Sequence, residues 1–205
     1  MKVLGIVLFF AILTTVMPMS VASAAPSKIT SVTLSNKPTS PEWTVLSPVW
    51  KFAKGKLDGS GVPTLSPKIE STATFPSDRT FSVNFKTVIQ GTQDYYAAWS
   101  VGKYVSEYNR TGIILHNSGV LEMFVSELGT TGLVDHIYTA ATSLSNLSSH
   151  SLTVVYTGNT AQVSIDGVLY LTVTDSIVGA LGACHVELAS WGNSESQFGG
   201  TTITF

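Results

Sequence analysis

The 205-residue sequence predicts an all-β fold in which two antiparallel sheets stack face to face. Three observations support this prediction. Apolar and polar residues alternate with period two along several segments after residue 25, which is typical of strands that bury one face. Turn residues separate these segments at the short spacing of sandwiches. Apolar residues at helical spacing are nearly absent from the same region.

The first element, residues 1–25, is predicted to be a secretory signal peptide. Lys2 precedes an apolar run over 3–16, and residues 22–24 read Ala-Ser-Ala, the pattern of small residues that a processing site accepts. An uncleaved anchor is the alternative, but the run is shorter than the roughly 20 residues that span a bilayer. We therefore expect an extracellular or cell-surface protein that meets a membrane only during export.

The next element, residues 26–47, is predicted to be an N-terminal strand and a proline-containing linker. Residues 29–34 have high β-propensity, and the stiff stretch 37–41 follows them. Prolines continue at positions 48, 63 and 67, where we expect exposed connections.

The N-terminal strand has two interpretations. It can pair within its own chain, beside the strand-like residues 201–205. Alternatively it can complete the sheet of a neighbouring copy, with Ile29, Val32 and Leu34 filling core pockets, as in surface filaments assembled by strand donation.

Residues 48–205 are predicted to form the sandwich itself. The clearest alternation places Phe81, Val83 and Phe85 on one side of a strand. A hairpin is expected at Asp166-Gly167, because this dipeptide supplies the positive φ angles of a two-residue turn. Further strands are expected at 95–101, 112–115, 121–125, 152–156, 161–165 and 184–188.

Composition excludes several functions. The net charge is -2 and charged residues make up only 12% of the chain, so no basic stripe is present to bind nucleic acid. The single cysteine, Cys184, excludes an intrachain disulfide, and its parity with Val186 and Leu188 predicts that it is buried. No motif implies a cofactor, and the histidines show no metal-ligand spacing. Calcium binding in a loop stays open.

From residue 68 onward the order of elements resembles the concanavalin A-like lectin and glucanase jelly rolls. The resemblance is one of pattern and covers about two-thirds of the chain. It implies a jelly-roll sandwich of two antiparallel sheets, one of them concave, with a polysaccharide site on the concave face. The residues that carry it are 69–75, 81–89, 97–99, 112–115 and the hairpin 164–168.

The resemblance directs attention to residues that oppose the core parity. An aromatic ring can cover the apolar face of a sugar while carboxylates accept bonds from its hydroxyls. Ordinary solvent-facing residues are the alternative reading of the same side chains. The predicted carbohydrate-binding residues are Trp99, Glu122, His185, Glu187 and Trp191, with Phe124 beside them.

Hydrolysis is the third hypothesis, after carbohydrate binding and self-assembly. A glycosidase needs two carboxylates at a set separation, and Glu122 and Glu187 are the pair we expect if the chain is an enzyme. The dense Glu-x-Asp-x-Glu pattern of jelly-roll glucanases is missing. We therefore favour a non-enzymatic protein whose partner is a polysaccharide or glycan.

Two acceptor sequons, at Asn109 and Asn146, predict glycosylation in loops if the host glycosylates exported proteins.

Overall fold

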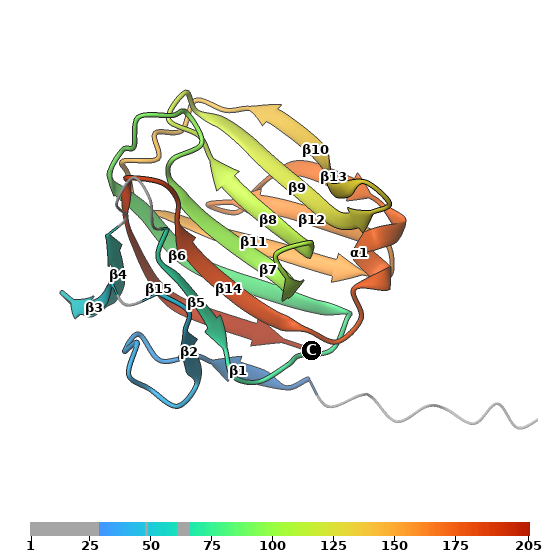
Figure 1. Ribbon diagram of the computed structural model, residues 1–205, viewed down its shortest axis with the longest axis horizontal. Helices are drawn as coiled ribbons and strands as arrows, with labels where there is room; N and C mark the ends of the chain where they lie inside the picture. Colours follow the sequence, from blue (N-terminus) through green and yellow to red (C-terminus); the bar gives the residue numbers. More distant parts are fainter. Residues whose placement is uncertain (1–28, 48, 61–65) are drawn as a thin grey trace, which may run out of the picture.

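The computed structural model describes residues 29–47, 49–60 and 66–205 (Figure 1), so the predicted signal peptide lies outside the described residues. Within these ranges the chain forms strands and one short helix. The elements are β1 (Ser31–Thr33), β2 (Trp43–Val45), β3 (Trp50–Ala53), β4 (Lys56–Ser60), β5 (Lys68–Ser71), β6 (Arg79–Ile89), β7 (Ala98–Ser106), β8 (Asn109–Leu115), β9 (Val120–Gly129), β10 (Gly132–Ala141), β11 (His150–Thr157), β12 (Thr160–Ile165), β13 (Val168–Thr174), α1 (Ser176–Ala180), β14 (His185–Ser190) and β15 (Glu195–Thr204).

The strands form two antiparallel sheets that stack face to face (Figure 1). An eight-stranded sheet has the order β13-β12-β11-β6-β15-β4-β3, and β1 also pairs with β15. A seven-stranded sheet has the order β10-β9-β8-β7-β14-β5-β2. The predicted two-sheet sandwich is therefore confirmed.

The core lies between the sheets and follows the predicted alternation. On β6, Phe81, Val83 and Phe85 are buried, whereas the side chains between them face outward. Cys184 is buried as predicted, at 2% exposure. Burial of one apolar face per strand is the main stabilising contribution in such a fold.

The N-terminal strand pairs within its own chain. This is the first of the two interpretations given above, in which residues 29–34 lie beside residues 201–205. Val32 of β1 lies opposite Ile203 of β15, and Thr30 and Phe205 exchange two backbone hydrogen bonds. β2 joins the other sheet through β5. The stretch after Pro38 contains three short strands that were not predicted, β2, β3 and β4, which fit between the prolines. Pro67 lies outside the strands, as expected, but it is buried rather than exposed, and Pro48 and Pro63 lie outside the described residues.

The predicted hairpin at Asp166-Gly167 is present between β12 and β13. Its φ angles are 52° and 79°, as a type I′ turn requires. The strand β10 was not predicted, because its residues alternate weakly at the edge of the sheet. Among the described residues, no helix is long and apolar enough to cross a membrane.

Two buried cations lie at the end of the sandwich where β6 begins. The Arg79 guanidinium, 3% exposed, donates to backbone carbonyls of the seven-stranded sheet and of the segments beside it, and to the Cys184 sulfur at 3.3 Å. Lys103, with no exposed surface, donates to Ser77 and to the Val178 carbonyl of α1. The carbonyls that Arg79 reaches belong to Phe75, Pro76, Gly102, Cys184 and His185.

Candidate functional site

The outer face of the seven-stranded sheet carries a second apolar cluster, separate from the main core. Strand pairing builds it: Trp99 of β7 lies opposite Ile114 of β8, which lies opposite Glu122 of β9. Residues directly opposite each other on neighbouring strands project to the same face of a sheet, so these three side chains share one side. The cluster contains Ala97, Trp99, Ile114, Phe124 and Ala189, with Trp191 packed against it.

Three aromatic rings form the centre of this cluster. The rings of Trp99 and Trp191 stack at 4.5 Å with an interplanar angle of 14°, and Phe124 lies 5.0 Å from Trp99. Trp99 is only 8% exposed, whereas Trp191 is half-buried. Trp191 is therefore the ring that can meet a ligand, and Trp99 supports it from beneath.

A glycine makes room for the third ring. A Cβ built at Gly112 would lie 2.0 Å from the Phe124 ring, so the ring rests directly on the β8 backbone. Any larger residue at this position would push Phe124 away from Trp99.

Two cations lie against the aromatic rings, and one carboxylate holds both. The Arg110 guanidinium lies 5.8 Å from the Trp99 ring and 5.4 Å from the Phe124 ring. The Lys68 ammonium lies 4.9 Å from the Trp191 ring. Glu107, in the turn between β7 and β8, accepts from Lys68 at 2.5 Å and from Arg110 at 2.7 Å.

Glu187 is a fully buried carboxyl group at the centre of this face. Its side chain has 0% exposure, and neither oxygen finds a hydrogen-bond partner among the described residues. The Arg110 guanidinium is 3.8 Å away. Burial raises the pKa of Glu187 to about 7, although the charges of Arg110 and Lys68 act in the opposite direction.

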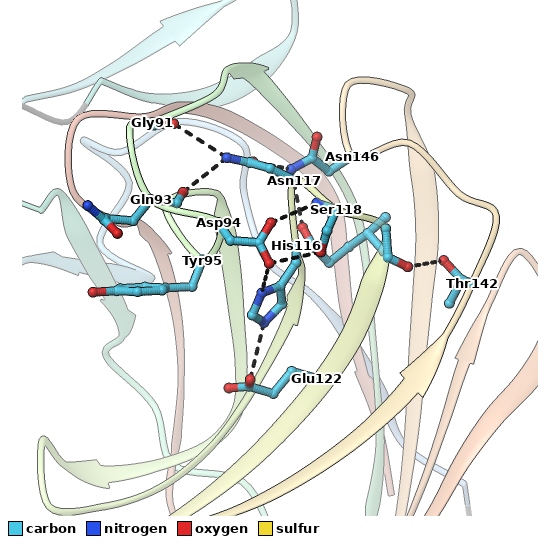
Figure 2. A network of polar contacts seen from close by, with 12 residues as sticks. Gly91, Gln93, Asp94, Tyr95, His116, Asn117, Ser118, Glu122, Thr142 and Asn146 are labelled. Carbon is cyan, nitrogen blue, oxygen red and sulfur yellow. Dashed lines mark hydrogen bonds and ion pairs between the residues drawn. The ribbon is translucent and has the colours of Figure 1, made fainter.

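A second polar group lies further along the same face (Figure 2). His116 bridges two carboxylates, with Nδ1 at 2.9 Å from Asp94 and Nε2 at 3.1 Å from Glu122. The hydrogen bond to Glu122, together with that to Asp94, raises the pKa of His116 despite its burial. Burial would raise the pKa of Asp94, but hydrogen bonds from Ser118 and His116 outweigh it and hold that pKa low. The three groups thus form a carboxylate–imidazolium–carboxylate chain.

The structure brings some of the predicted site residues together and separates others. Trp99, Trp191 and Glu187 belong to one cluster, and Glu122 lies at its edge. His185 lies at the start of β14, where its Nδ1 is 2.6 Å from the Ser71 carbonyl, so it fastens β5 rather than joining the aromatic rings.

The expected catalytic pair is not brought together. Glu122 lies on β9 and Glu187 on β14, with β8 and β7 between them. Three inter-strand spacings correspond to about 14 Å, beyond the separations of retaining and inverting glycosidases. This pair therefore does not fit the geometry that we expected of an enzyme.

The sequon at Asn146 is also not presented for modification. Asn146 is 1% exposed, and its amide nitrogen donates to the Leu115 carbonyl and to Asn117. A glycan on this nitrogen would replace one of its two N–H groups and so remove at least one of these bonds. Asn109 is half-buried at the start of β8 rather than in a loop.

Sequence reasoning missed the charged groups of the site. Arg110 shares its parity with Gly112 and Ile114, so extending the predicted strand backward by two residues would have found it. Lys68 and Glu107 had no such signal, because strand order alone brings them together. In residues 29–47, 49–60 and 66–205, no three His, Cys, Asp or Glu side chains gather as a metal site.

The fold is shared with solved structures at low sequence identity. A carbohydrate-binding module, CBM66 from Bacillus subtilis, matches with a TM-score of 0.63 at 14% identity, over 80% of this chain and 96% of that one. A Bacillus licheniformis β-glucanase matches with a TM-score of 0.61 at 12% identity, over 85% and 96%. The Crh5 transglycosylase in complex with NAG matches with a TM-score of 0.64 at 13% identity, over 85% and 83%.

These structures are concanavalin A-like jelly-roll sandwiches, and the fold predicted from the sequence is confirmed. At such identities the likeness establishes the fold alone. No protein-family model matches this chain, and no curated protein matches it by sequence.

Proposed function

We propose that the chain binds a carbohydrate on the outer face of the seven-stranded sheet and does not cleave it. The observation that carries this proposal is the second apolar cluster, in which Trp191 lies half-buried above Trp99. An aromatic ring supported from beneath and surrounded by charged groups suits a sugar, which has an apolar face and hydroxyl edges.

The polar groups of the face extend the proposed site. Glu122 lies two strands from Trp99, which corresponds to about 10 Å across the sheet. A short glycan that crosses the strands could therefore contact Trp191 at one end and the Glu122 carboxylate at the other. The similar structures include a carbohydrate-binding module and glycoside hydrolases, and both classes support a carbohydrate ligand.

Binding without cleavage is favoured by the arrangement of the carboxylates. Glu187 is buried beside Arg110. Glu122 lies three strands away from Glu187 and is hydrogen-bonded to His116. Asp94 is the carboxylate that lies near Glu122, and the same His116 imidazole is hydrogen-bonded to both of them. We also propose an extracellular or cell-surface location, on the strength of residues 1–25.

Replacing Trp191 tests the face directly. We expect Trp191→Ala to weaken glycan binding about tenfold, because the stacking surface is lost while the sheet beneath it stays intact. Affinity gel electrophoresis of the mature protein in a panel of soluble glucans, mannans and polyuronates measures the effect. Phe52→Ala is the matched control, since Phe52 is an exposed aromatic on β3 of the other sheet.

If a glycan in the gel slows Trp191→Ala as much as it slows the parent chain, this face is not the binding site. Release of reducing ends from a retained glycan would show that the chain is a hydrolase instead.

A further inference from the structure

Glu107 connects two cations that come from distant parts of the sheet. Lys68 belongs to β5 and Arg110 to β8, and β7 and β14 lie between these strands. Each cation donates to a different oxygen of the Glu107 carboxylate, at 2.5 Å and 2.7 Å. The Glu107 carboxylate therefore lies between two cations, Lys68 on one side and Arg110 on the other.

Both cations also cover the aromatic rings of the proposed site. Lys68 lies over the face of Trp191, and Arg110 lies against Trp99 and Phe124. While Glu107 holds the cations there, they occupy the aromatic surface that a sugar would use. The side chain of Glu107 is 43% exposed on a hairpin turn, so it can move into water without disturbing the sheet.

Arg110 keeps an unused donor at this position. Its Nε is buried and finds no hydrogen-bond partner among the described residues. Glu107 is bound through Nη1. The two-pronged geometry that arginine favours through Nε pairs this nitrogen with Nη2, so the Glu107 carboxylate does not occupy that edge of the guanidinium.

We propose that the ligand is an acidic glycan whose sugar carboxylate replaces that of Glu107 between Lys68 and Arg110. The inference rests on the carbohydrate-binding function proposed above and names the class of sugar, a uronic acid. In the free protein Glu107 stands in for the ligand and keeps the cations over the rings. On binding, the sugar carboxylate accepts from both cations and draws Lys68 off the face of Trp191, and the ring of the same sugar contacts the uncovered face.

The other charges nearby are compatible with an anion in this position. Glu187 lies opposite Glu70 in the strand register and 3.8 Å from Arg110. Its burial favours the neutral acid, so Glu187 adds less negative charge than a free carboxylate would. Displacement of Glu107 leaves the count of negative groups around the two cations unchanged.

The experiment compares polygalacturonate with its fully methyl-esterified form, which has the same backbone without the charge. Titration calorimetry is performed on the mature chain and on Glu107→Gln, Lys68→Gln and Trp191→Ala. We expect Glu107→Gln to bind polygalacturonate about fivefold more tightly, because the internal competitor is removed. Lys68→Gln is expected to weaken this binding at least fivefold, and raised salt to weaken it further. Neither of these two charge changes nor raised salt is expected to affect binding of the ester, whereas Trp191→Ala is expected to weaken binding of both forms.

Equal affinity for the acid and the ester, or weaker polygalacturonate binding by Glu107→Gln, would overturn the inference. If the chain binds neutral glycans through Trp191 but not polyuronates, the carbohydrate function stands and the acidic-sugar inference fails. If no glycan of either kind binds, both proposals fail. Thermal unfolding of each variant separates loss of binding from loss of folding.

Discussion

At pH 8 the Glu187→Gln variant is expected to be about 3 kcal/mol more stable than the parent chain. The pKa of Glu187 rises from 4.5 to about 7 on folding, because burial disfavours the charged carboxylate. Folding therefore favours the protonated form. The contribution of the protonated Glu187 side chain to the free energy of unfolding is fully present below pH 4.5 and is lost as the pH rises through about 7. Gln keeps the shape of the neutral acid and cannot lose a proton.

Urea unfolding at several pH values between 4.5 and 8 measures this difference. The gap between the two chains should be small at pH 4.5 and widen towards pH 8. Glu70→Gln is the matched control, since Glu70 lies opposite Glu187 on β5 and is half-buried. Stability curves that run parallel for the parent and Glu187→Gln would show that the carboxyl group is not neutral in the fold.

Replacement of Arg79 by Met is expected to destabilise the fold by about 4 kcal/mol, because buried carbonyls lose their donor. Arg79 belongs to the eight-stranded sheet, yet it reaches the Gly102 and His185 carbonyls of the other sheet. Its guanidinium therefore joins the two layers at one end of the sandwich. Methionine restores part of the buried volume but none of the bonds.

Thermal and urea unfolding of Arg79→Met give this value. Lys86→Met is the control, because Lys86 lies on the same strand with its side chain outside the core. Arg79→Lys should fall between the two, since one ammonium cannot reach every carbonyl. A loss below about 1 kcal/mol for Arg79→Met would mean that the carbonyls find other partners.

The sandwich could be predicted because burial on one face leaves a period-two pattern, as at Phe81, Val83 and Phe85. The turn at Asp166-Gly167 could be predicted because it needs positive φ at both positions. The short strands between the prolines could not, since strands of three to five residues are too brief to show a period. Their pairing with β15 and β5 depends on the rest of the sheets.

The site was predicted in part for a similar reason. Parity placed Trp99, Glu122 and Glu187 on the outer face, but it carries no information about which strands are neighbours. The separation of Glu122 from Glu187 and the convergence of Lys68 with Arg110 both follow from strand order. Long-range order of this kind is set by the packing of the whole sandwich, and a single sequence does not display it.

The pairing of Thr30 with Phe205 makes the two ends of the described fold neighbours, so a short bridge could join them and close the backbone into a ring. Such a ring could be reopened at the exposed Thr130-Thr131 turn, which joins β9 to the edge strand β10. A circularly permuted chain of this kind would carry fusion partners away from β1 without altering the aromatic rings or their charged neighbours.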